Sequence, residues 1–292
     1  MILRFLQRTC RPCVSVFCSW KARASLIAAA ALVPFAAGVS GQELKTPQVE
    51  GSYLGVTQLG VVEPVPTEIG LAIEIQDSRR FRGTLSYVEQ DNLIVSGSIA
   101  SSGKCQITAE SDEARATIQL DWQNFGGGAA ILIGELALTT VRESQTGPVA
   151  FLRPFDNPAV DWSRQTGRYS SSFTSASNRE PIHALLDITA GARGILRATI
   201  AGWTDPDSQP ILPDPPGWTD PDTQPVVIGT TSAAGGLIAV GVGSGPNQIV
   251  TLTGNVATDE EGLAVAIDGT YRIDHTTGKR LDQGTFRVHL AP

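Results

Sequence analysis

Apolar and polar residues alternate with a period of two along several stretches of the chain. The apolar positions are Leu71, Ile73 and Ile75; Ala114, Ala116, Ile118, Leu120 and Trp122; Leu263, Val265, Ile267, Gly269, Tyr271 and Ile273; and Phe286, Val288 and Leu290. This period places one set of side chains on a core and the other set in water, so each stretch predicts a β-strand. No long stretch after residue 42 has the helical period.

Clusters of glycine and small polar residues separate these stretches, at residues 101–104, 124–128, 244–247 and 258–262. Such clusters are typical of tight turns. Many short strands joined by turns predict an all-β fold, either an antiparallel barrel or a sandwich. The Cys/Trp/Cys core pattern of an immunoglobulin-type sandwich is missing, which favours the barrel.

The chain also repeats itself. Five segments of the first half have counterparts in the second: Gly51-Ser-Tyr53 and Gly167-Arg-Tyr169; Arg82–Leu85 and Arg193–Leu196; the stretches from Gly97 and Gly229; Gly134–Leu138 and Gly269–Ile273; and the stretches from Gly147 and Gly284. The third and fourth segments are 37 residues apart in the first half and 40 in the second, and the last two are 13 and 15 apart. This agreement predicts two tandem β domains, residues 51–155 and 167–291, joined by a linker at 156–166.

One interval differs between the halves. Gly83 and Gly97 are 14 residues apart, whereas Gly194 and Gly229 are 35 apart. The excess of 21 residues is nearly the length of a Pro/Asp-rich insertion at residues 202–225, which contains GWTDPDSQP and GWTDPDTQP. Proline lacks the donor that a sheet interior needs, so the insertion is expected to be an extended surface loop.

The insertion holds the candidate ligand residues. These are Trp203, Trp218, Asp205, Asp207, Asp220 and Asp222. Carboxylate oxygens suit calcium, although the EF-hand length, glycine and closing glutamate are absent. Two exposed indoles would stack on a sugar or a peptide, while the alternative is that each tryptophan folds back and caps its own sheet.

Residues 1–41 have the pattern of a secretory signal. Five basic residues and no acid precede the apolar run at 25–39, which Pro34 interrupts. This run is shorter than the roughly 20 residues of a membrane helix, so we expect cleavage after Gly41 and export to the periplasm, the cell surface or the medium. An uncleaved anchor is the alternative.

Cleavage would change the charge and the cysteine count. Loss of the five basic residues lowers the formal charge from −7 to −12. An acidic chain is a poor partner for nucleic acid and for anionic lipid, so we expect no nucleic-acid binding and no stable membrane insertion after cleavage. Cys105 would be the one remaining cysteine, and we expect it to be a small buried apolar residue rather than a catalytic thiol.

The sequence offers little support for catalysis. His183, His275 and His289 fall in different expected strands, and the chain lacks HExxH and, after residue 41, GxSxG. The acidic pairs Asp112/Glu113 and Glu260/Glu261 lie in turn sequences, where we expect them to be solvated. We therefore expect no enzyme activity and no cofactor, with calcium as the alternative.

The Gly-x-Tyr at the start of each half, followed by glycine-containing strands and tight turns, resembles the calycin-type barrels such as lipocalins and avidins. Tyr53 and Tyr169 replace the tryptophan of their Gly-x-Trp motif, and no ligand residue can be transferred. The pattern is also similar to exported bacterial proteins of unknown role. We expect a non-enzymatic binding or structural module with an unidentified protein or a glycan as partner. The alternatives are a calycin-like carrier of a small apolar ligand and a surface enzyme with its site between the domains.

Overall fold

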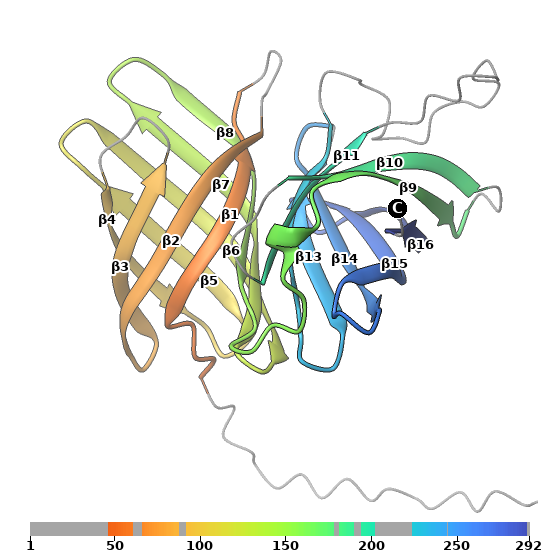
Figure 1. The fold of residues 1–292 in the computed structure, drawn as a ribbon. Coiled ribbons are helices and arrows are strands. Elements are labelled where there is room, and N and C mark those ends of the chain that lie inside the picture. The colour runs from red at the N-terminus through yellow and green to blue at the C-terminus, as the bar shows by residue number, and fades with distance from the viewer. Residues whose placement is uncertain are drawn as a thin grey trace, which may run out of the picture. The chain divides into compact units, whose positions relative to one another are not determined.

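The computed structural model describes residues 46–60, 66–87, 92–177, 181–189, 194–201, 224–243 and 245–290. These residues form sixteen strands and one short 3₁₀ helix, all within the unit Glu43–Pro292. The strands close into two eight-stranded antiparallel barrels (Figure 1). The structure thus confirms the all-β prediction and shows barrels rather than sandwiches. In the described part of the chain, no helix has the length and apolar character needed to cross a membrane.

Barrel 1 contains the first eight strands in chain order. They are β1 (Gly51–Gln58), β2 (Pro66–Asp77), β3 (Arg80–Tyr87), β4 (Leu93–Ile99), β5 (Lys104–Glu110), β6 (Ala114–Gly126), β7 (Ala129–Thr140) and β8 (Ser144–Arg153). Each strand pairs with its neighbour along the chain. Pairing of Leu54 in β1 with Leu152 in β8 closes the barrel.

Barrel 2 repeats this arrangement after the 3₁₀ helix η1 (Trp162–Arg164). Its strands are β9 (Gly167–Ser175), β10 (Pro181–Thr189), β11 (Ile195–Ala201), β12 (Val226–Thr231), β13 (Gly236–Val242), β14 (Gln248–Thr258), β15 (Ala264–His275) and β16 (Arg280–His289). Phe173 in β9 pairs with Phe286 in β16 and closes the barrel.

The repeated sequence segments occupy the same strand of each barrel. The five pairs fall on or next to the first, third, fourth, seventh and eighth strands. The register agrees as well, because Leu136 pairs with Gly147 in barrel 1 and Tyr271 pairs with Gly284 in barrel 2. Residues 202–225 connect β11 to β12, the third and fourth strands of barrel 2.

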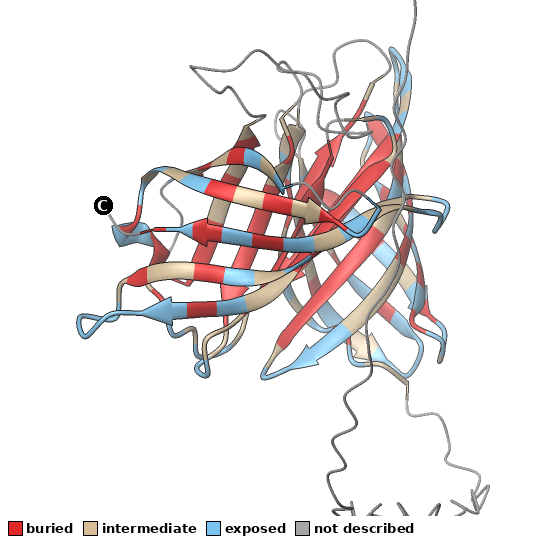
Figure 2. Ribbon diagram, turned by 90° about the vertical axis from the view of Figure 1, so that its right-hand side faces the viewer, coloured by how far each residue is buried: buried red, intermediate tan, exposed pale blue. Residues whose placement is uncertain are grey.

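The alternating positions line the two barrel interiors, with two exceptions (Figure 2). Ile75 was expected on the core face but is 61% exposed, because the β2–β3 register shifts between Ile73 and Ile75. Leu263 and Val265 were also expected on the core face, yet Ala264 is the buried residue there, since the β14–β15 pairing shifts by one residue at this point. In both places a β-bulge reverses the alternation.

Side chains fill the interiors. Barrel 1 holds one cluster of buried residues that includes Tyr53, Phe81 and Phe151, and barrel 2 holds a second that includes Phe173 and Tyr271. Packed interiors are usual for eight strands, whose diameter suits side chains or one small ligand.

Cys105 lies in the interior cluster of barrel 1, as predicted. Its exposed fraction is only 2%. Burial, with a smaller contribution from the charge of Asp121, raises the pKa of its thiol to about 12.

A third apolar cluster joins the two barrels. It contains outward-facing residues of barrel 1 and of barrel 2: Val56, Ala129, Ile131, Ile133, Ala150, Leu152, Ile195, Ile228, Ile238, Val240, Val242 and Ile249. We call this set the inter-barrel cluster. The strands that supply it are buried on both faces, so residues 129–133 and 237–242 are apolar or glycine without alternation.

Polar contacts flank the inter-barrel cluster. Arg197 of β11 forms an ion pair with Glu68 of β2, with 2.7 Å between guanidinium nitrogen and carboxylate oxygen. The Thr276 hydroxyl donates a hydrogen bond of 3.4 Å to the Glu135 carboxylate. Apolar burial, with these polar contacts at its edge, joins the two barrels.

Candidate functional site

The connections between the strands of barrel 2 are divided between its two ends. In an antiparallel meander the connections alternate between the ends, so Ser175, Ala201, Val242 and His275, at which the odd-numbered strands finish, all lie at one end. We call this the insertion end of barrel 2. The candidate site is built there, because the opposite end is closed.

Trp162 of η1 helps to close that opposite end. Its side chain is fully buried in the barrel 2 cluster, and its indole nitrogen donates a hydrogen bond of 3.1 Å to the Thr231 hydroxyl. The Gln165 amide nitrogen donates to the carbonyl of Ala264 at 2.7 Å. Trp162 and Gln165 therefore cover the end of barrel 2 that lies opposite the insertion end.

A polar cluster faces the interior at the insertion end. The Asp282 carboxylate accepts hydrogen bonds from the Tyr271 hydroxyl at 2.8 Å, from the Ser175 hydroxyl at 2.7 Å and from the backbone N–H of Gln283 at 2.8 Å. The Ser175 and Ser177 hydroxyls are 2.8 Å apart. We call Ser175, Tyr271 and Asp282 the Tyr271–Asp282 cluster.

Aromatic rings support this cluster from within the barrel. Phe173 meets Tyr271 edge to face, with 5.6 Å between ring centroids, and stacks on Phe286 at 5.8 Å. Burial raises the pKa of the Tyr271 phenol, and its hydrogen bond to Asp282 and the charge of that residue raise it further. The phenol therefore stays protonated and keeps its role as a donor to the carboxylate.

Asp282 has no cationic partner in the described part of the chain: no basic side chain there lies within ion-pair distance of it. Arg280 is the nearest in sequence, but it pairs with Asp274 at 2.6 Å and also contacts the Gln283 side chain. Asp282 is also only partly exposed. The groups that donate hydrogen bonds to Asp282 in the described part of the chain are thus all uncharged.

Barrel 1 provides an internal comparison. With the matched glycines as anchors, Leu59, Leu136 and Gln145 occupy the positions of Ser175, Tyr271 and Asp282. Leu59 and Leu136 belong to the apolar core of barrel 1. The same strand positions are therefore uncharged in barrel 1 and include a carboxylate in barrel 2.

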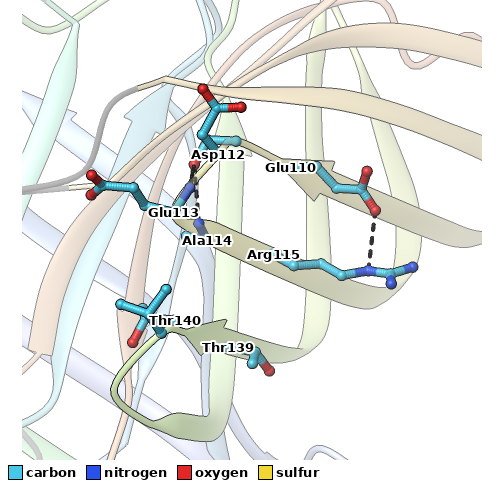
Figure 3. Close-up of a pocket in the computed structure, with 9 residues that line it drawn as sticks. Glu110, Asp112, Glu113, Ala114, Arg115, Thr139 and Thr140 are labelled. Atoms are coloured by element: carbon cyan, nitrogen blue, oxygen red, sulfur yellow. Dashed lines mark hydrogen bonds and ion pairs between the residues drawn. The ribbon is translucent and has the colours of Figure 1, made fainter.

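The corresponding end of barrel 1 has a shallow depression on its outside (Figure 3). Its volume is about 320 Å³, and it is lined by the β5–β6 and β7–β8 turns. Glu110 pairs with Arg115 at 3.1 Å, while Asp112 and Glu113 are exposed, as predicted for a solvated turn. Within the described residues, no group of three or more His, Cys, Asp or Glu side chains is arranged to hold a metal ion.

A second depression, of about 550 Å³, lies at the other end of barrel 1. The Arg153 guanidinium there donates to the carbonyls of Gly128, at 2.6 Å, and of Glu50. It also lies over the Tyr53 ring, 5.5 Å from its centroid, while burial raises the pKa of the Tyr53 phenol to about 12. These contacts tie the start of β1 to the end of β8, so Arg153 acts as a structural clamp.

The residues proposed from sequence are not the residues of this cluster. Trp203, Trp218, Asp205, Asp207, Asp220 and Asp222 lie outside the described residues. The two described residues nearest to them in the chain, Ala201 and Gln224, belong to the insertion end. The histidines lie apart, in β10 and at the ends of β15 and β16, as predicted.

No protein-family model and no curated protein matches the chain. Several solved structures show a weak likeness, among them the following three. A DUF3598 protein of unknown function from Nostoc punctiforme is 11% identical, covering 85% of this chain and 98% of its own (TM-score 0.24). Kievitone hydratase from Nectria haematococca is 13% identical, covering 87% and 93% (0.24), and a putative AttH from Nitrosomonas europaea is 12% identical, covering 82% and 91% (0.23). Likeness at this level assigns no function.

Proposed function

We propose that the protein is an exported, non-enzymatic binding module whose ligand binds at the insertion end of barrel 2. The Tyr271–Asp282 cluster is the observation that carries this proposal. A partly buried carboxylate costs free energy that the uncharged Gln145 at the matching position of barrel 1 avoids, and Leu59 and Leu136 replace its two hydroxyl donors there. Such departures from a locally consistent pattern concentrate at functional sites.

In this proposal barrel 1 is the scaffold. Its interior is filled with apolar side chains, and the inter-barrel cluster fixes it to the outer face of barrel 2. Filled interiors favour a ligand held at the barrel end over an apolar ligand carried deep inside. The surface enzyme with a site between the barrels has little room, because apolar side chains occupy that interface.

The insertion is part of this proposal because of the strands that it connects. The insertion connects Ala201, the last residue of β11, to Val226, the first residue of β12, and both of these lie at the insertion end of barrel 2. We propose that Trp203 and Trp218 extend the binding surface toward a glycan, a protein or a small ligand. Calcium binding by the four aspartates of the insertion remains a separate hypothesis.

Native mass spectrometry tests the proposal. The full chain is expressed, and the protein is purified and weighed under native and denaturing conditions, with and without calcium. We expect cleavage near residue 41 and a co-purifying mass that is lost on denaturation and is absent from the Tyr271→Phe/Asp282→Asn variant. Calcium adducts removed by changing Asp205, Asp207, Asp220 and Asp222 to Asn would assign binding to the insertion instead. A bare mass under every condition would contradict the proposal.

A further inference from the structure

The geometry points to a small organic ammonium ion as the ligand of the Tyr271–Asp282 cluster, with the Asp282 carboxylate as its counter-charge. This inference rests on the proposed function, because it names the chemistry of the same barrel end.

The first argument is charge. The three donors to Asp282 are two hydroxyls and a backbone N–H, all of them neutral. They hold the carboxylate in one orientation, and no described basic side chain forms an ion pair with it. An ammonium group complements that charge and brings up to three N–H donors, and charge-assisted hydrogen bonds are about twice as strong as neutral ones. An anionic ligand would be repelled at the same place.

The second argument is the surroundings of the carboxylate. The Tyr271 hydroxyl that contacts Asp282 belongs to a ring packed against Phe173, which in turn stacks on Phe286. Aromatic rings attract cations, and more strongly where water is excluded. The three rings are buried and form an apolar wall behind the Tyr271 hydroxyl. Such a wall favours an ammonium that carries apolar carbon over a hydrated metal ion, for which the described residues offer no cluster of ligands.

The third argument is that the fold does not need the cluster. Leu59 and Leu136 close barrel 1 at the positions of Ser175 and Tyr271 in the same register. A structural closure of barrel 2 would therefore be served by apolar residues. The polar set is better explained by a ligand that supplies the missing positive charge.

Ligand-detected NMR tests this inference with two probes of equal size and different charge, n-butylammonium and 1-butanol. Each is titrated into the wild-type protein, into Asp282→Asn and into Asp268→Asn. Asp268 is a matched control, because it lies on the outer face of β15, paired with Arg287 and more than half exposed. Both variants lose one negative charge, so long-range electrostatics change equally.

We expect saturable binding of n-butylammonium to the wild type and to Asp268→Asn, at least tenfold weaker binding to Asp282→Asn, and no saturable binding of 1-butanol. Equal binding of the two probes would overturn the ammonium inference and leave the proposed function standing. Loss of binding in both variants would also overturn it, since the charge of the whole chain would then be responsible. If no probe binds to the folded wild type, the inference fails.

Discussion

Truncation of Ile131 to alanine tests whether the two barrels fold as one cooperative unit. Ile131 lies in β7 of barrel 1, is fully buried and belongs to the inter-barrel cluster. It pairs with Leu152 of β8, another member of that cluster. Its removal therefore weakens the contact between the barrels and leaves the interior of barrel 1 intact.

The expected size follows from burial. Truncation of a fully buried isoleucine to alanine costs about 2–5 kcal/mol of unfolding free energy, because it removes apolar contacts and leaves a cavity. For a protein of this size, each kcal/mol lowers Tm by roughly 2–4 °C, so the expected fall is about 4–20 °C. Ile94→Ala is the matched control: Ile94 is 74% exposed on β4, and the change in free energy should stay within about 0.5 kcal/mol.

Differential scanning calorimetry is the assay. We expect the wild type to unfold in a single transition and Ile131→Ala to keep a single transition at a lower temperature. Two transitions, of which only one moves, would show that the barrels unfold independently and would refute the reasoning. An equal shift in Ile94→Ala would refute it as well, because burial would then not set the cost.

Four further predictions concern the interiors. Gly83→Ala should abolish soluble expression, since its Cβ would lie 1.8 Å from the Ala72 carbonyl oxygen; a normal yield would contradict this packing. Cys105 should react with a thiol reagent in urea but not in the native protein. The pKa of this thiol is about 12 in the native protein, against 9.0 for the unperturbed thiol, so the unfolded state loses the proton first as pH rises. Cys105 should therefore lower the free energy of unfolding above pH 9. Urea titrations of the wild type and of Cys105→Ala at several pH values would show this as a pH-dependent difference between the two proteins. Trp162→Phe removes the buried hydrogen bond to Thr231 and should cost about 1–3 kcal/mol in urea unfolding; an unchanged midpoint would show that this bond does not stabilise the closed end.

Alternation and turn chemistry were enough to predict the class of fold. Strands β6 and β16 follow the period-two pattern closely, so their inward residues could be named from sequence. Ile75 and Ala264 escaped that reasoning, because a bulge depends on how two strands pair rather than on the sequence of either one.

The contact between the barrels was also missed, although the sequence carries a signal for it. Residues 129–133 and 237–242 are uninterrupted apolar or glycine runs, which are typical of strands buried on both faces. One barrel alone would bury only the inward half of each run. The apolar residues of the outward half therefore indicate that a second apolar surface covers them.

The Tyr271–Asp282 cluster could have been found by comparing the two halves. The alignment that pairs Gly134 with Gly269 and Gly147 with Gly284 places Tyr271 opposite Leu136 and Asp282 opposite Gln145. What the sequence could not supply is that the ends of β9, β15 and β16 bring these side chains within hydrogen-bond distance. That step requires barrel closure.

The central claim is that the insertion end of barrel 2 binds a ligand, and fluorine NMR with 3-fluorotyrosine tests it most directly. The chain has four tyrosines, Tyr53, Tyr87, Tyr169 and Tyr271, and Tyr271→Phe identifies the signal of interest. The ligand recovered from the native complex is then titrated in. The account predicts a saturable shift of the Tyr271 signal with Tyr53 and Tyr87 of barrel 1 unchanged. A shift confined to the barrel 1 tyrosines, or no shift at all, would contradict it.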